Sequence, residues 1–222
     1  LSWYERCKDA YLDQAITSSG LIYRKGGYGV VQDYAKAVEC FRKSSDLGRG
    51  VGSLNLGVMY YFGSGVVKSF TEARKLFKKA ADKNNLASAS YRLGLMMIKG
   101  EGGEKDVIGG TALINKAAEQ GNAEAKTYLA KALYEEGKVL EAANLGYPKA
   151  MGKMAENYLD GENGFEVDYA KGFEWATKAA NEGDESSMCE LGRCYSSGWG
   201  VAKNYVTALS WYERCKGAYL DQ

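Results

Sequence analysis

The most constraining feature of this sequence is a pattern of glycines, small residues and aromatic rings that recurs about every 36 residues. One clear copy contains, in order, Leu56-Gly57, Tyr60, Gly63, Gly65-Val66, Ser69, Ala73 and Lys79-Ala80-Ala81. The same order returns from Leu191-Gly192 to Trp211. A bulky position in the second half of each copy falls at Trp3, Cys40, Leu76, Leu113, Lys138, Trp175 and Trp211. The steps of 37, 36, 37, 25, 37 and 36 residues indicate an array of similar units, one of them shortened by about a dozen residues.

Each copy is predicted to be a pair of antiparallel helices, because apolar and small residues recur at helical spacing on both sides of a glycine-rich joint. Gly57 in the first helix would let a neighbouring helix approach closely. The second helices are expected to begin after residues whose side chains can accept a hydrogen bond from first-turn amides: Asp33, Ser69, Asp106, Asp168 and Asn204. They are expected to end at glycines: Gly48, Gly121, Gly146 and Gly183.

The order Leu-Gly, Tyr, Gly-x-Gly-Val, Asp, Lys-Ala, Trp and Lys-Ala-Ala resembles the Sel-1-like repeat (SLR) family, a relative of the tetratricopeptide repeats. Tetratricopeptide units have a period of about 34 residues, which is absent here. The resemblance covers nearly the whole chain. It implies an all-α fold, a right-handed superhelical solenoid of antiparallel helix pairs.

We therefore expect a single repeat domain over residues 1–222. Its parts are residues 1–14 as the second helix of a preceding repeat, then repeats at 15–51, 52–88, 89–124, 125–149, 150–186 and 187–222. Repeat 4, residues 125–149, lacks the Gly-x-Gly-Val joint and much of its second helix. A local change of superhelical path is expected there.

The two ends of the chain are almost identical. Residues 1–14 match residues 209–222 except for Asp9 against Gly217. This identity is compatible with a recent duplication, a segment cut from a longer periodic array, or an engineered or misassigned end. The half repeats would leave an apolar face at each end unless another unit or a second copy covers it, so self-association through the ends is an alternative.

The charge and residue composition argue against several classes of function. With 29 Lys and Arg against 28 Asp and Glu, the net charge of +1 provides no field to attract nucleic acid. The chain has no His, which removes the most common general base and metal ligand. No nucleophile is paired with a base, and the glycine joints lie between helices rather than after a strand. We therefore expect no enzymatic activity, cofactor or metal.

The five cysteines are Cys7, Cys40, Cys189, Cys194 and Cys215, and none forms a CxxC pair. We interpret them as small buried residues. A disulfide between the helices that carry Cys194 and Cys215 is a further possibility.

No segment of the sequence is suited to crossing a membrane. The longest clean apolar stretch, Leu93 to Ile98, is far shorter than the roughly 20 residues that span a bilayer. We expect a soluble protein without direct membrane insertion and slightly favour the cytoplasm. Because the sequence begins at Leu1 without Met, we expect it to be a fragment of a longer chain.

A binding surface is predicted where the first helices line the inner wall of the stack. In repeats 2 and 3 this face is almost entirely apolar, and exposed apolar strips commonly mark binding sites. The predicted partner-binding residues are Leu54, Val58, Tyr61, Phe62, Tyr91, Leu95 and Ile98. Charge preference would be set further along by Lys131, Glu156 and Arg193. Alternatively, tight curvature of the stack buries the apolar strip against the next repeat.

These observations predict an adaptor or scaffold that binds another protein, through a peptide or an amphipathic helix. A structural module that self-associates is the first alternative. The resemblance also implies a second alternative, β-lactam binding or hydrolysis, because cysteine-rich bacterial relatives have been linked to it. Those relatives carry regularly spaced Cys pairs, whereas Cys189 and Cys194 have no counterpart in the other repeats of this chain.

Overall fold

The computed structural model describes residues 12–220, which fold into twelve helices. Those of the first half are α2 (Leu12–Lys25), α3 (Tyr34–Asp46), α4 (Gly50–Phe62), α5 (Phe70–Asn84), α6 (Ala87–Lys99) and α7 (Val107–Glu119). They are followed by α8 (Ala123–Glu135), α9 (Val139–Asn144), α10 (Pro148–Asp160), α11 (Tyr169–Asn181), α12 (Glu185–Ser197) and α13 (Tyr205–Leu220). The sole β pairing between residues 12 and 220 is an isolated antiparallel bridge from Gly27 to Val30.

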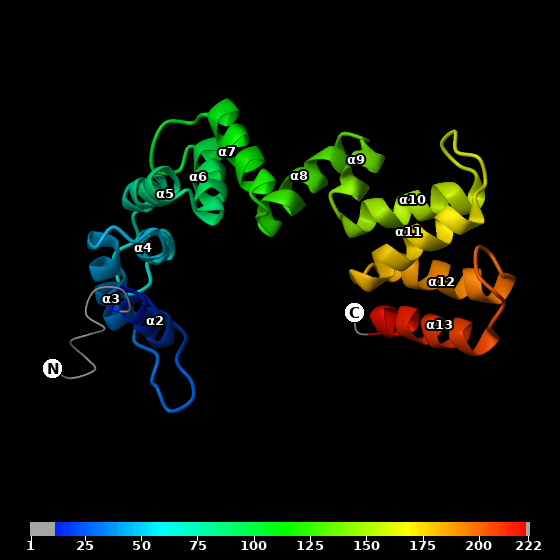
Figure 1. Cartoon of the computed structure of the whole chain (residues 1–222), viewed down its shortest axis with the longest axis horizontal. Coiled ribbons are helices and arrows are strands. Elements are labelled where there is room, and N and C mark those ends of the chain that lie inside the picture. Colours follow the sequence, from blue (N-terminus) through cyan, green and yellow to red (C-terminus); the bar gives the residue numbers. More distant parts are fainter. Residues whose placement is uncertain (1–11, 221–222) are drawn as a thin grey trace. The chain divides into compact units, whose positions relative to one another are not determined.

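The chain forms two compact units that divide after Ala125, within α8. In the first unit, each helix from α2 to α6 packs against the next helix along the chain, so that the packed series ends at α7. In the second unit, α9 to α13 pack in the same sequential manner, and α10 also contacts α12. Figure 1 shows the successive helix hairpins within each unit. The predicted all-α solenoid of antiparallel helix pairs is confirmed.

The predicted caps lie at the starts of the second helices. Asp33, Asp106 and Asp168 accept hydrogen bonds from the amides three residues on, at 2.9, 2.8 and 3.0 Å. Ser69 and Asn204 do the same at 3.3 and 3.0 Å. The predicted stop glycines come just after their helices, all with left-handed backbone: Gly48, Gly121, Gly146 and Gly183. The boundaries of the second helices therefore follow from local sequence.

Two of these caps predict an acid-sensitive contribution to stability. The amide of Lys36, with its ammonium, lowers the pKa of Asp33, and Lys171 lowers the pKa of Asp168 in the same way. A carboxyl with a lowered pKa stabilises the folded state above the unfolded pKa, and this contribution is lost as the pH falls through the folded pKa. The melting temperature should therefore decrease when the pH is lowered below about 4.

The matched variant for this prediction is Asp33→Asn with Asp168→Asn. Asn204 shows that an Asn side chain can cap the same position of the repeat, and an amide does not titrate. Thermal melts between pH 3 and pH 7 should show a smaller acid-induced drop in the double variant than in the wild type. An unchanged drop would contradict the assignment of this acid sensitivity to the two caps.

Small residues on the first helices admit the large side chains of the second helices, as predicted for Gly57. A Cβ atom at Gly57 would lie 2.7 Å from Cε1 of Phe77, whose ring is 1% exposed. Phe77 packs in one core cluster with Ala73, Ala80 and Leu93, which come from α5 and α6. Each core cluster is therefore built by helices that are neighbours in sequence.

The second glycine of the joint connects one repeat to the preceding one. A Cβ atom at Gly65 would lie 2.6 Å from the carbonyl oxygen of Tyr34, the first residue of α3. Gly102 and Gly200 would meet the carbonyl oxygens of Phe70 and Tyr169, the first residues of α5 and α11. The glycine pair thus allows the joint to pack directly on the backbone of the preceding second helix.

The second helix of the predicted repeat 4 is short. This helix, α9, has six residues, whereas α3, α5, α7 and α11 have 13 to 15. Gly164, the last glycine of the following joint, would meet no atom within 4 Å of an added Cβ. Gly65, Gly102 and Gly200 pack on the first residue of the preceding second helix. The preceding second helix of Gly164 is α9, which lacks these first turns because it begins only at Val139. The change of superhelical path stays a prediction.

The cysteine expectations are partly corrected. Cys189 of α12 and Cys215 of α13 form a disulfide with 5.6 Å between their Cα atoms, so the partner of Cys215 is Cys189 and not Cys194. Cys194 comes five residues after Cys189, which turns it about 140° around the helix. It is buried, and burial raises the pKa of its thiol to about 12. Cys40 is only half-buried.

Most of the residues to which the predictions about the chain ends refer lie outside the described range of 12–220. Cys7 and most of the predicted leading helix, residues 1–14, precede Leu12. The repeat boundaries and the self-association of the ends therefore stay predictions.

Candidate protein-interaction surface

A cavity of about 290 Å³ lies between the first helices α4 and α6 of the first unit. Four of the predicted partner-binding residues line it: Val58, Tyr61, Phe62 and Leu95. The other lining residues are Phe77, Arg92, Met96, Lys99 and Glu101. The volume is near the lower end of the range for ligand pockets, which suits one large apolar side chain rather than a whole cofactor. We call this set of residues the α4–α6 groove.

The aromatic side of the α4–α6 groove is held by ring contacts. Tyr61 meets Phe62 edge to face at 5.0 Å between ring centroids, and Phe70 at 5.1 Å. Burial raises the pKa of Tyr61, and the hydrogen bond and negative charge of Glu101 raise it further. The phenol therefore stays neutral. Phe62 is 63% exposed and provides an apolar edge that a partner could cover.

The rim of the α4–α6 groove carries charge. Arg92 lies 3.8 Å from Glu124, a distance at which an exposed ion pair contributes little. Lys99, at the end of α6, is exposed and forms no ion pair with any residue from 12 to 220. A carboxylate on a partner could therefore pair with Lys99 without displacing an existing bond.

The remaining predicted apolar residues lie beside the groove. Leu54 packs against the core cluster of α5 and α6 and does not line the cavity. Ile98 lies against α7, with its Cγ1 atom 2.7 Å from where a Cβ of Gly110 would be. Tyr91 is half-buried and does not line the cavity either. The structure thus brings together Val58, Tyr61, Phe62 and Leu95 and places the other three predicted apolar residues outside the cavity.

The three predicted charged residues belong to the second unit, where each has an ion-pair partner. Lys131 lies 3.8 Å from Glu135, and Glu156 lies 2.8 Å from Lys153. Arg193 bonds Asp160 at 3.1 Å and Glu190 at 2.7 Å, and its guanidinium lies 5.0 Å from the centroid of Trp199. Their charges are thus largely balanced within their own surroundings.

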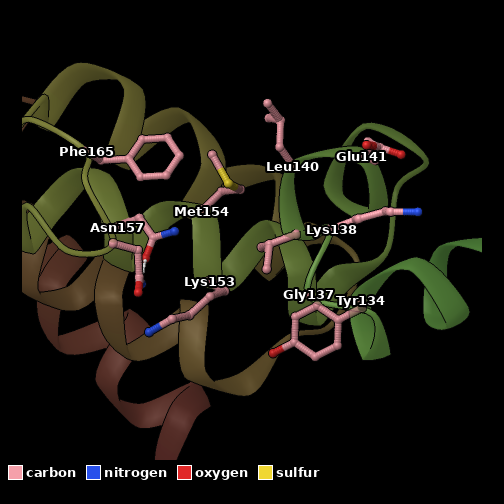
Figure 2. Close-up of a pocket in the computed structure, with 11 residues that line it drawn as sticks. Tyr134, Gly137, Lys138, Leu140, Glu141, Lys153, Met154, Asn157 and Phe165 are labelled. Atoms are coloured by element: carbon pink, nitrogen blue, oxygen red, sulfur yellow. Dashed lines mark hydrogen bonds between the residues drawn. The ribbon is translucent and has the colours of Figure 1, made fainter.

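A second cavity, of about 680 Å³, lies in the second unit at the shortened repeat. We call it the α9 cavity. It is lined by Tyr134, Gly137, Lys138, Val139, Leu140, Glu141, Lys153, Met154, Asn157, Asn163 and Phe165. Figure 2 shows Met154, Asn157 and Phe165 grouped on one side, with Leu140 and Tyr134 across from them.

Sequence reasoning missed part of both cavities. In the α4–α6 groove it missed Arg92 and Lys99, which come one residue before and six residues after Leu93. For the α9 cavity, two signals were available. One was the short step of 25 residues, and the other was an Asn at a position where two other repeats have Met59 and Met96.

Sequentially packed helix pairs with glycine joints define an α-solenoid repeat protein. A profile of the Sel1 repeat family matches residues 14–48, 52–85, 87–122, 148–184 and 185–214, which together make up most of the chain. The chain belongs to the Sel1 repeat family. Sel1 repeat proteins are in general protein-interaction modules.

Individual relatives agree with this assignment. The chitin synthase regulator SKT5 of Saccharomyces cerevisiae is 38% identical over 78 residues, covering 35% of this chain and 11% of that protein. The crystal structure of a Sel1 repeat protein from Oxalobacter formigenes superposes with a TM-score of 0.72 at 27% identity, covering 93% of this chain and 62% of that one. The crystal structure of a protective antigen of uropathogenic Escherichia coli with an SLR fold superposes with a TM-score of 0.64 at 30% identity. That match covers 96% of this chain and 47% of the antigen. This chain therefore spans only part of each relative.

Between Leu12 and Leu220, no helix combines the length and the hydropathy that a bilayer-spanning segment needs.

Proposed function

We propose that this chain is an adaptor that binds an amphipathic helix of a partner protein in the α4–α6 groove. The observation that carries the proposal is the cavity formed by Val58, Tyr61 and Leu95 on consecutive first helices. An apolar side chain of the partner would enter this cavity and cover Phe62. Helix-in-groove recognition of this kind relies on a few buried apolar anchors.

Two of the three charged lining residues of the groove, Arg92 and Lys99, are cations, and this balance favours an acidic partner helix over a basic one. Lys99 has no ion-pair partner among the described residues, and Arg92 has only the distant Glu124. A carboxylate one turn from the apolar anchor would lie near both cations. Leu54, Tyr91 and Ile98 would extend the apolar contact. Lys131, Glu156 and Arg193 belong to the second unit, where they would set the charge preference of that unit's own surface.

An adaptor role also agrees with a relative, because SKT5 is named a regulator of chitin synthase. A regulator acts through another protein, which is what an adaptor without chemistry of its own would do. We propose that this chain has no catalytic activity of its own.

The test compares two double variants in affinity capture from the source cell, followed by direct titration of the captured partner. Val58→Glu with Leu95→Glu places two charges in the groove, and affinity should fall at least tenfold, roughly 1.4 kcal/mol or more. Val67→Glu with Ile108→Glu is the control, because these side chains are 89% and 87% exposed outside the groove. Binding by the control should match the wild type.

Two further measurements complete this test. Circular dichroism should show the same helix content in all variants, since loss of the fold in the groove variant would show that the strip is core. Lys99→Glu, at an exposed position, should weaken binding of an acidic partner helix without affecting the fold. Unchanged binding by the groove variant would contradict the proposal, and a molar mass that rises with concentration in light scattering would favour self-association.

A further inference from the structure

The α9 cavity and the α4–α6 groove occupy corresponding places in their repeats. Leu56 marks a fixed position of the first helix in the repeat pattern, and in repeat 4 the residue at this position is Leu129. Tyr61 and Tyr134 each come five residues after that leucine. Three further pairs of lining residues correspond in the same way: Phe77 with Val139, Arg92 with Lys153, and Met96 with Asn157. The α9 cavity is thus a second instance, in the other unit, of a hollow that the repeat itself creates.

The α9 cavity is larger than the α4–α6 groove because repeat 4 lacks the first turns of its second helix. We count positions in each second helix from the bulky position of the repeat, which is Lys138 in repeat 4. In the other repeats, a small buried residue lies three positions before it: Ala37, Ala73, Gly110, Gly172 and Ala208. In repeat 4 the helix begins only at Val139, one residue after Lys138. The cavity measures about 680 Å³, against about 290 Å³ for the groove.

The wall of the α9 cavity contains an unusual polar residue. Asn157 is 3% exposed and takes the place that the buried Met59, Met96 and Cys194 hold in other repeats. Its Oδ1 atom accepts a hydrogen bond from Nδ2 of Asn163 at 2.7 Å. Its own Nδ2 donates no hydrogen bond to any residue that the structure describes, and Figure 2 shows it turned toward the cavity.

The Nδ2 group of Asn157 faces the cavity, where a ligand or a water molecule can accept its hydrogen bond. A Met at this position would fill the space without offering a donor, as Met96 does in the first unit. Asn157 therefore suits a ligand that offers a hydrogen-bond acceptor.

The two cations that line the α9 cavity are already paired, whereas its carboxylate, Glu141, forms no ion pair with any residue from 12 to 220. Lys153 bonds Glu156 at 2.8 Å and Glu162 at 3.2 Å, and Lys138 bonds Glu136 at 2.9 Å. No cation of the lining is left to bind a phosphate or a free carboxylate. The groups available for recognition are the apolar surfaces of Met154, Phe165 and Leu140, the amide of Asn157 and the carboxylate of Glu141.

We propose that the α9 cavity binds a short peptide segment of a partner protein that carries no acidic side chain. One apolar side chain of the segment packs against Met154 and Phe165, and a backbone carbonyl accepts the hydrogen bond from Nδ2 of Asn157. A peptide is the occupant that fits, because helix backbone and side chains fill the corresponding space in the other repeats. This site shares no residue with the α4–α6 groove, so it stands independently of the function proposed above.

The experiment uses a phage-displayed library of random twelve-residue peptides as the probe, selected on the whole chain. Asn157→Met is the decisive variant, because it installs the residue that the chain uses at this position elsewhere. Asn181→Met makes the same exchange at an exposed site on α11 and is the matched control. The wild type and the control should enrich peptides with a shared apolar residue, and Asn157→Met should not.

Synthetic versions of the enriched peptides give the quantitative result. In isothermal titration, Asn157→Met should bind at least tenfold more weakly than the wild type, while its melting temperature is equal or higher. That combination separates loss of a site from loss of the fold. A library without enrichment on the wild type, or equal binding by Asn157→Met, would overturn the proposal.

Discussion

Replacing Phe77 by alanine is expected to lower the free energy of unfolding by about 3–5 kcal/mol, the usual range for removing a buried Phe ring. The ring is 1% exposed and fills the space that Gly57 leaves on α4. It also belongs to one core cluster with Leu93 of the next helix pair, so its loss opens a cavity between two helix pairs. The surrounding helices can close this gap only by changing their spacing.

Chemical denaturation followed by circular dichroism measures this effect. Phe62→Ala is the matched control, because it removes the same ring from a neighbouring helix where the side chain is 63% exposed. The control should lose about 0.5 kcal/mol or less. Equal losses in the two variants would contradict the assignment of Phe77 to the core between the pairs.

Replacing Gly102 by alanine is expected to destabilise the chain by about 2–5 kcal/mol. The left-handed backbone of Gly102, with φ of 70°, costs a residue with a Cβ about 1–2 kcal/mol. The new Cβ would also overlap the backbone of Phe70 and Thr71, and overpacking typically adds about 1–3 kcal/mol. Backbone atoms at the start of α5 cannot rotate away as a side chain could.

Gly164 provides the control for this prediction. Its backbone is also left-handed, with φ of 83°, but an added Cβ would meet no atom within 4 Å. Gly164→Ala should therefore carry only the backbone cost of about 1–2 kcal/mol. Denaturation of the two variants isolates the contact between repeats, and equal losses would contradict a packing role for the second joint glycine.

The helix pairs and their boundaries were predictable from the sequence because local residues determine them. Asp33, Asp106 and Asp168 cap the helices that follow them with their own side chains, and Gly48 ends a helix with its own backbone. The apolar residues of the groove were also predictable, since Val58 and Leu95 occupy the same position in successive repeats. Periodicity fixes which face of a helix a residue occupies.

Contacts between neighbouring pairs were less accessible to sequence reasoning. The partner of Cys215 depends on the rotation of α12, which places Cys189 rather than Cys194 opposite it. Ile98 has the spacing of a groove residue but packs on α7, because Gly110 leaves room for it there. The α9 cavity required knowing that no other segment fills the space of the missing turns. Each of these depends on distances between helices, which the repeat pattern does not specify.

The central claim is that each helix pair is stabilised by its sequence neighbours rather than by one core shared across the chain. Hydrogen exchange of Phe77→Ala, followed by mass spectrometry, tests this claim most directly. The account predicts faster amide exchange in α4, α5, α6 and α7, with exchange in α10 to α13 unchanged from the wild type. An equal acceleration in the helices of both units would contradict it.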